Sequence, residues 1–156
     1  MSLLPATFTF EIVSPERMVV REDVHEAQIP ARGGYLGVLP GHAPLLTQLQ
    51  TGEVRYRKDN YDYFVAVSGG YAEVLADRVI LLAERAERAE EVDVERARKA
   101  RQRAEARLAR LNDPEIDMVR ARAALARAAN RLRVADRHVT AAAAARVAPS
   151  PAPHAP

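Results

Sequence analysis

The spacing of apolar residues changes once along this chain of 156 residues, close to Ala83. Before that point apolar and polar residues alternate over short segments, which are separated by glycine, asparagine and aspartate. After it, apolar residues recur every three or four positions. A period of two is typical of β-strands and a period near 3.6 of α-helices. The sequence therefore predicts a β domain over residues 1–87 and a helical domain over residues 88–137.

The first half contains several short strand patterns. Phe8, Phe10 and Ile12 share one face of a strand, and Lys58-Asp59-Asn60 is a turn signal between two further strands. Gly69-Gly70 is expected to end the strand that begins near Tyr61. All eight aromatic residues lie in this half, as expected if it holds the core. Closely spaced strands with no helical pattern between them favour an antiparallel β-sandwich or barrel.

The second half predicts two helices joined by a short loop. The apolar stripe of the first helix is Ala97, Ala100, Ala104, Leu108 and Leu111, and that of the second is Met118, Ala121, Leu125, Ala128, Leu132 and Ala135. Between them, Asp113 is expected to be the N-cap of the second helix and Pro114 its first residue. A loop this short makes the two helices an antiparallel hairpin.

The stripes of this hairpin consist mainly of alanine. Alanine favours helix locally, but its small side chain buries little apolar area. Two interpretations stay open on this pattern: a stable two-helix appendage, or a hairpin docked so weakly that it can rearrange. Beyond the hairpin, residues 138–156 are rich in alanine and proline and are expected to form a disordered tail without an assigned function.

The residues that most chemistry requires are missing or scattered. The chain has no cysteine, and its four histidines lack the spacing of metal ligands, so no metal site is predicted. The glycines between Gly33 and Gly37 lack the order of a nucleotide-binding loop and are expected to form a tight turn. No nucleophile is paired with a base, and we therefore expect no catalytic residues. We also expect no signal peptide, and no apolar run approaches the roughly 20 residues that would span a membrane.

Charge is distributed unevenly along the chain. From Glu84 onward there are sixteen basic residues against eleven acidic ones, whereas the part before it is mildly acidic. This cationic arm can be a solvated face, or it can bind phosphates, an acidic protein surface or nucleic acid. No aromatic residue follows Tyr71, so the arm has no stacking platform for bases, and a nucleic-acid partner is not expected.

Several separated motifs resemble the epsilon subunit of bacterial F-type ATP synthases over about residues 7–137. The most specific is Gly34-Tyr35-Leu36-Gly37-Val38-Leu39-Pro40-Gly41-His42-Ala43-Pro44-Leu45-Leu46-Thr47, which is similar to the family signature G-x-L-G-(I/V)-x-P-G-H-A-P-L-L-T. Phe10-Glu11-Ile12-Val13-Ser14-Pro15, Val67-Ser68-Gly69-Gly70 and Asn130-Arg131-Leu132 also match, in the same order.

The resemblance implies a central-stalk rotor subunit that couples the catalytic head to the c-ring and has no active site of its own. It implies a sandwich in contact with the gamma subunit and the c-ring, for which we expect Gly34, Tyr35, Leu36 and His42. It also implies a mobile hairpin that permits ATP hydrolysis when folded down and inhibits it when extended into the alpha/beta hexamer. The residues expected to meet an acidic segment of the beta subunit are Arg120, Arg122, Arg127, Arg131 and Arg133. The implied location is peripheral, on the cytoplasmic face of the inner membrane.

In part of the family the folded-down hairpin binds ATP through the pattern (Ile/Leu)-Asp-x-x-Arg-Ala. The resemblance carries this role to Val92, Asp93, Arg96 and Ala97, with Glu87 upstream and with Arg127 and Arg131 opposite. Valine at the first position departs from the pattern and is expected to weaken the contact. ATP would thus be a regulatory ligand, and no cofactor is required.

From the residues alone, Asp93 is equally an N-cap, and the two roles are compatible. The same letters recur in residues 116–121, which we interpret as the start of the second helix and assign no site. The alternative for the whole chain is a free-standing β-sandwich adaptor whose basic arm binds acidic protein or nucleic acid.

Overall fold

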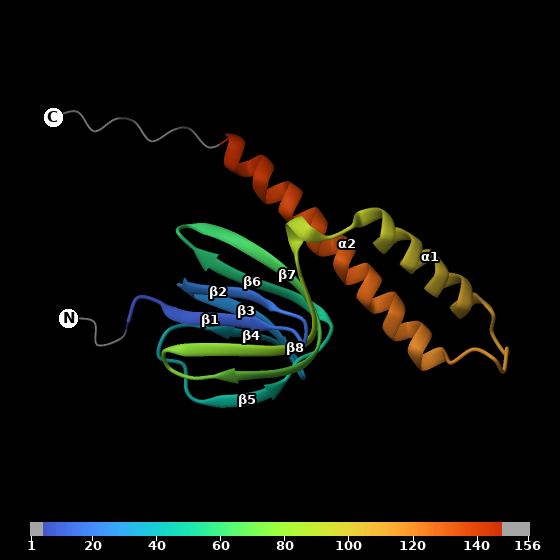
Figure 1. Cartoon of the computed structure of the whole chain (residues 1–156), viewed down its shortest axis with the longest axis horizontal. Coiled ribbons are helices and arrows are strands. Elements are labelled where there is room, and N and C mark those ends of the chain that lie inside the picture. Colours follow the sequence, from blue (N-terminus) through green and yellow to red (C-terminus); the bar gives the residue numbers. More distant parts are fainter. Residues whose placement is uncertain (1–4, 148–156) are drawn as a thin grey trace.

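The computed structural model describes residues 5–147, which form a β-sandwich joined to a helical hairpin (Figure 1). The eight strands are β1 (Phe8–Val13), β2 (Met18–Val24), β3 (Glu26–Ala31), β4 (Gly34–Val38), β5 (Leu45–Gln48), β6 (Gly52–Lys58), β7 (Tyr61–Val74) and β8 (Arg78–Arg88). A short 3-10 turn, η1 (Ala89–Glu91), then leads into the helices α1 (Val94–Ala109) and α2 (Met118–Val147). The predicted order of strands followed by two helices is confirmed.

The strands form one hydrogen-bonded network that folds into two layers at β7 and β8. The order along it is β2-β1-β8-β7-β6-β3-β4, with β5 also paired to β7. The first half of β7 pairs with β6 and the second half with β5, while β8 follows β7 through both layers. Gly69 and Gly70 lie where β7 changes partner, with φ angles of +68° and +104°. The predicted strand end at these glycines was wrong, because their positive φ bends one long strand without ending it.

One ladder departs from the predicted antiparallel arrangement. Strand β1 runs parallel to β8, in the register Thr9↔Arg78 to Val13↔Leu82, whereas the other ladders between named strands of the described chain are antiparallel. Parallel neighbours need a long connection, and the whole of the sandwich between β1 and β8 provides it.

The core lies between the two layers and contains three of the eight aromatic residues, Phe8, Phe10 and Tyr56, whereas four of the five tyrosines are exposed. Phe10 and Ile12 are fully buried, and Phe8 meets Phe10 edge-on with ring centroids 6.3 Å apart. Tyr56 from β6 lies 5.5 Å from the ring of Phe10, and burial raises the pKa of Tyr56 to about 12. The alternation predicted for residues 7–13 is therefore confirmed.

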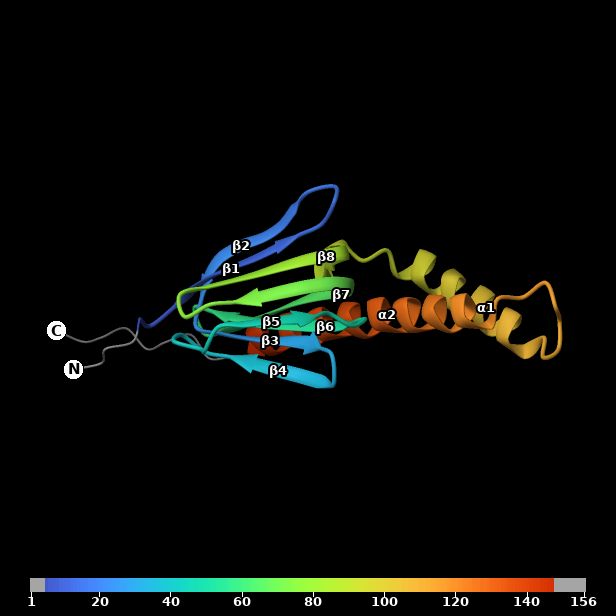
Figure 2. The ribbon, with the colours of Figure 1, turned by 90° about the horizontal axis from the view of Figure 1, so that it is seen from below.

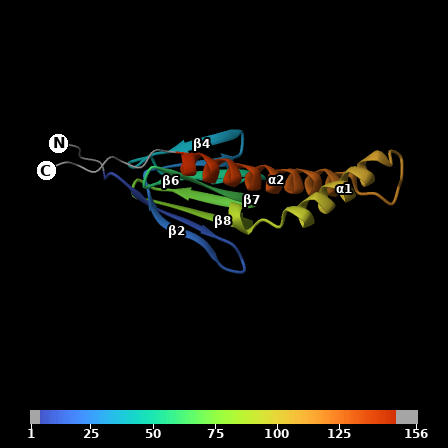
Figure 3. The same cartoon turned by 90° about the horizontal axis from the view of Figure 1, so that it is seen from above.

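The helices pack on each other and only part of the hairpin lies on the sandwich. Ala97 and Ala104 of α1 and Ala121 and Ala128 of α2 are buried. Helix α2 also contacts β6, β7 and η1, whereas the main partner of α1 is α2. Figures 2 and 3 show α2 along one outer face of the sandwich, with α1 and the first half of α2 projecting beyond its end.

The loop between the helices corrects two predictions. Helix α2 begins at Met118, because Asp117 caps it through a 3.0 Å hydrogen bond from the Arg120 amide. Asp113 accepts from the Glu115 amide at 2.9 Å instead, and so closes a turn rather than capping the helix. Leu111, placed in the apolar stripe of the first helix, lies beyond the end of α1 and is 72% exposed.

Helix α2 is also longer than predicted. It continues through Val147, ten residues beyond position 137, the predicted end of the hairpin. Residues 141–145 are all alanine, the residue with the highest helix propensity, and the first proline of the tail follows only at Pro149. The remainder of the predicted tail, residues 148–156, lies outside the described residues.

Candidate functional site

A cavity of about 620 Å³ lies where the hairpin meets the sandwich. Its walls come from α1, α2, the linked strands β7 and β8, and the turn between β1 and β2. Because both helices and the sandwich contribute walls, the cavity exists only while the hairpin is docked.

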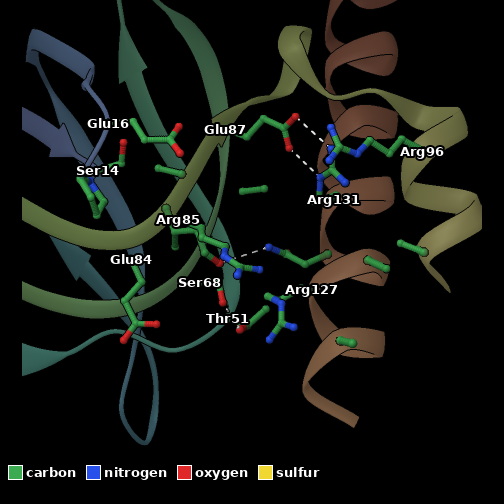
Figure 4. A pocket seen from close by; sticks show the side chains of 18 of the residues that line it. Ser14, Glu16, Thr51, Ser68, Glu84, Arg85, Glu87, Arg96, Arg127 and Arg131 are labelled. Carbon is green, nitrogen blue, oxygen red and sulfur yellow. Dashed lines mark hydrogen bonds and ion pairs between the residues drawn. The ribbon is translucent and has the colours of Figure 1, made fainter. Parts of the chain in front are cut away.

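Four of the seven residues predicted to bind a nucleotide line this cavity. They are Glu87 from β8, Arg96 from α1, and Arg127 and Arg131 from α2. Figure 4 shows Glu87 on the sandwich side facing Arg131 and Arg96 on the helix side, with Thr51 and Ser68 on the sandwich side near Arg127. Thr51 and Ser68, 2.9 Å apart, were not predicted, because they come from separate segments with no motif of their own.

The arginines in the cavity differ in how their charge is balanced. The Arg131 guanidinium donates two hydrogen bonds to the Glu87 carboxylate, at 2.6 and 3.1 Å, and these raise the pKa of Arg131. Among the described residues, Arg96 and Arg127 make no ion pair. Guanidinium groups bind phosphate with paired hydrogen bonds, so these two arginines make the cavity a candidate anion site.

Asp93, Val92 and Ala97 do not line the cavity. The Asp93 carboxylate caps α1 by accepting the Arg96 amide at 2.9 Å, while Ala97 is fully buried and Val92 half-buried. The capping role of Asp93 is thus confirmed. In the second copy of the motif Asp117 caps α2 in the same way, as predicted for a helix start.

The Asp93 cap is expected to stabilise the first turn of α1. Replacing Asp93 by alanine is expected to destabilise the start of α1 by about 1 kcal/mol, because the Arg96 amide loses its acceptor. Faster hydrogen exchange of the α1 amides would report this. Glu95→Ala is the matched control, since Glu95 lies in the same turn but makes only an exposed pair with Arg98. Equal exchange in the two variants would contradict the capping role.

An ion pair between the sandwich and η1, the segment that links β8 to α1, was not predicted. Arg17, in the β1–β2 turn, donates to both carboxylate oxygens of Glu91 in η1, and this contact lowers the pKa of Glu91. Glu91 also accepts the Arg88 amide at 3.3 Å. Arg17 and Glu91 are 74 positions apart in the chain, so no local pattern indicates this pair.

The four residues expected to contact gamma and the c-ring do not form one cluster. Gly34, Tyr35 and Leu36 lie on β4, where Tyr35 is 53% exposed and its hydroxyl accepts the Glu53 amide at 3.3 Å. His42 lies in the loop after β4. The amide of the preceding residue, Gly41, donates to the carbonyl of Ala76, so this loop lies beside the β7–β8 turn. That turn precedes β8, whose other end leads to the hairpin, so His42 is at the end of the sandwich remote from the linker.

The five arginines expected to meet the beta subunit point in two directions. At about 100° per residue, Arg120, Arg127 and Arg131 share one side of α2, and Arg122 and Arg133 another. Arg127 and Arg131 line the cavity, while Arg122 and Arg133 are exposed. The docked hairpin therefore does not present all five to one partner.

The chain matches known families over nearly all of its described length. The family described as "ATP synthase, Delta/Epsilon chain, beta-sandwich domain" covers residues 7–89, and its "long alpha-helix domain" covers residues 90–136. The ATP synthase epsilon chain of Moorella thermoacetica is 51% identical over 131 residues, which are 83% of this chain and 97% of that one. The epsilon chain of Syntrophobacter fumaroxidans is 50% identical over 127 residues, covering 81% and 94%.

Solved structures give the same result. A chain of the Euglena gracilis mitochondrial ATP synthase, in a structure of OSCP, F1 and the c-ring, is similar with a TM-score of 0.69 and 25% identity. The match covers 80% of this chain and 79% of the other. A chain from the central stalk and c-ring of the Tetrahymena thermophila enzyme shares the fold, with a TM-score of 0.52 and 13% identity over 84% and 95% of the chains.

These matches support a central-stalk subunit of ATP synthase and not the free-standing adaptor. The chain belongs to the delta/epsilon family of ATP synthase subunits, and is a non-catalytic part of the central stalk of that complex.

Proposed function

We propose that the hairpin is a mobile regulator of ATP hydrolysis and that a nucleotide bound in the cavity favours its docked arrangement. The observation that carries this proposal is the cavity itself, which takes Arg96 from α1, Arg127 and Arg131 from α2, and Glu87 from the sandwich. A ligand that needs all of these walls binds the docked hairpin and not an extended one. It therefore shifts the equilibrium toward docking by RT ln(1 + [L]/Kd), about 1.4 kcal/mol at tenfold excess.

The small docking surface of the hairpin supports mobility. The apolar cluster beneath α2 consists of Ala66, Ala89 and Val134 with the partly buried Phe64, whereas the sandwich core is far larger. The first half of α2 and all of α1 project from the sandwich (Figure 2). Since apolar burial contributes roughly 25 cal/mol per Å², a contact of two alanines, one valine and a partly buried phenylalanine gives little resistance to undocking.

The charges in the cavity suit a polyphosphate. Arg96 and Arg127 are available for phosphate oxygens, and Arg131 can join them by exchanging its contact with Glu87. The hydroxyls of Thr51 and Ser68 offer hydrogen bonds to the less charged part of a nucleotide. We assign the triphosphate to the arginines and ATP to the site as a regulatory ligand.

Calorimetry on the isolated chain tests the nucleotide site. The wild type is expected to release heat with millimolar ATP, and Arg127→Ala is expected to weaken binding roughly 10- to 100-fold through the loss of charged hydrogen bonds. Arg122→Ala is the matched control, because Arg122 is on the other side of the same helix and exposed. No heat with the wild type, or equal affinity for all three chains, would contradict the proposal.

The same arginines serve the inhibitory arrangement. Arg127 and Arg131 face the cavity when the hairpin is docked, so an acidic segment of the beta subunit can reach them only after undocking. Nucleotide binding and contact with beta are then mutually exclusive uses of these two residues. Arg120, Arg122 and Arg133 complete the proposed contact, which contributes more to steering and register than to affinity.

We further propose that the sandwich is the rotor-docking part. Tyr35 on β4 and His42 in the following loop are exposed or partly exposed residues of the signature region, and we assign them, with Gly34 and Leu36, to contacts with gamma and the c-ring. None of the helices in residues 5–147 combines the length and the apolar character needed to cross a bilayer. We place the chain peripherally, at the cytoplasmic face of the inner membrane.

A further inference from the structure

One buried amide joins α2 to the sandwich. Asn130 is 4% exposed and donates from Nδ2 to the Gly52 carbonyl at 2.8 Å, with the Val67 carbonyl at 3.5 Å. Gly52 and Val67 face each other as a pair at one end of the β6–β7 ladder. The other polar atom of this amide, Oδ1, accepts from Arg133 at 2.8 Å. Both halves of the Asn130 side chain thus have partners.

The other polar contacts between docked α2 and the sandwich are more exposed than Asn130. The pair Arg131–Glu87 has side chains 25% and 28% exposed, and in the pair Arg137–Glu53 the arginine is 59% exposed with a separation of 3.6 Å. Partly exposed ion pairs contribute little, because water screens them. A buried hydrogen bond has a larger effect when one partner is removed, because the other partner is left unsatisfied away from water. Among the polar contacts between α2 and the sandwich, the one made by Asn130 is therefore expected to cost most when it is lost.

The position of Asn130 in α2 also determines where the cavity arginines point. Arg127 and Arg131 are three residues before it and one residue after it, and all three line the cavity. The amide reaches the Gly52 and Val67 carbonyls from one rotation and one axial position of the helix. A slide or a roll of α2 would break this contact and turn both arginines away together.

We propose that Asn130 is the positioning residue that selects the docked state of the hairpin and orients Arg127 and Arg131 into the cavity. Its role in docking stands on the contacts with Gly52 and Val67. Its role toward a nucleotide rests, in addition, on the proposed function. Because an undocked amide and the freed carbonyls are satisfied by water, the contact favours docking without preventing release.

Distance measurements between spin labels test the role in docking. The chain has no cysteine, so Gln28→Cys on β3 and Gln102→Cys on α1, both at exposed positions, would be its only thiols. The docked chain is expected to give one narrow distance distribution. Asn130→Leu, which keeps the side-chain volume and removes the donor, is expected to raise the undocked population about tenfold or more and to broaden that distribution.

Two further variants separate hydrogen bonding from other causes. Asn130→Ala is expected to undock in the same way, although alanine strengthens the helix, so that loss of helix cannot explain the result. Asp136→Ala, at an exposed position later in α2, is expected to leave the distribution unchanged. If the Asn130→Leu chain stays docked, the proposal is overturned. If Asn130→Ala undocks while Asn130→Leu stays docked, Asn130 only fills space.

Added ATP distinguishes this proposal from the nucleotide site. If ATP restores the narrow distribution of the Asn130→Leu chain, both proposals are supported. If Asn130→Leu undocks and calorimetry shows no ATP binding to the wild type, Asn130 remains the positioning residue for docking and the nucleotide site fails. Unfolding followed by tyrosine fluorescence checks that the sandwich, which contains all five tyrosines, is intact in each variant.

Discussion

An ATP synthase that carries this chain shortened after Glu91 is expected to hydrolyse ATP faster than the complex with the full chain. The cut removes α1 and α2 and keeps the Arg17–Glu91 contact and the end of β8. The core residues of the sandwich all lie before the cut, so the surface proposed to contact gamma and the c-ring is retained. If the hairpin restrains hydrolysis with a coupling free energy of 1–3 kcal/mol, the rate rises roughly 5- to 150-fold.

The measurement is the ATPase rate of the assembled complex at low and high ATP. The difference between the two chains is expected to be largest at low ATP, where the full-length hairpin has less ligand to favour docking. The matched control is a chain shortened after Val147, which removes only residues 148–156 and leaves both helices in place. Equal rates for the Glu91-shortened and full chains, with both retained in the complex, would show that the hairpin is not inhibitory.

Gly70→Ala is expected to destabilise the sandwich by about 3–5 kcal/mol, a large part of the free energy of unfolding of a small domain. Gly70 has φ +104°, and a Cβ atom there would lie 1.9 Å from the carbonyl oxygen of Leu82 and 2.9 Å from the Cα of Ala83. Both are backbone atoms of β8, so neither can move without opening the β7–β8 ladder. Urea unfolding followed by tyrosine fluorescence measures the effect on the sandwich.

Gly37→Ala is the matched control for this substitution. Gly37 is also in a strand, but nothing lies within 4 Å of its added Cβ and its φ is not positive. We expect a change of less than about 1 kcal/mol, because alanine there restricts mainly the unfolded chain. A similar loss of stability at both positions would contradict the steric explanation for Gly70.

The two glycines at the bend of β7 illustrate how far local sequence reasoning reaches. Gly69-Gly70 was recognised as an interruption of the strand pattern, but its effect depends on β5 and β6, which pair with different halves of the same strand. Those partners lie before β7 in the chain and no local pattern identifies them. The parallel ladder between β1 and β8 was missed for the same reason, since it joins the two ends of the sandwich.

In the candidate site, too, contacts between near neighbours in the chain were predicted and contacts between distant residues were not. Asp93 as a helix cap was predicted from its own segment and is confirmed, because capping involves an amide only three residues away. The pair Arg131–Glu87 joins residues 44 positions apart, and only the resemblance placed them in one site. Asn130 carried a local signal that was missed: it is a buried polar residue within the alanine-rich, inward side of α2.

The sequence by itself determined the two-part architecture, the Asp93 cap of α1 and the family, because periodicity, propensity and motifs depend on neighbours in the chain. The tertiary structure decided which side of α2 faces the sandwich, that Arg127 and Arg131 share a cavity with Glu87, and that Val92 and Ala97 do not. These outcomes depend on long-range contacts such as Asn130 with Gly52, across 78 positions. A hairpin of alanines has no strong apolar preference for one docking position, so a few polar contacts with distant strands decide it.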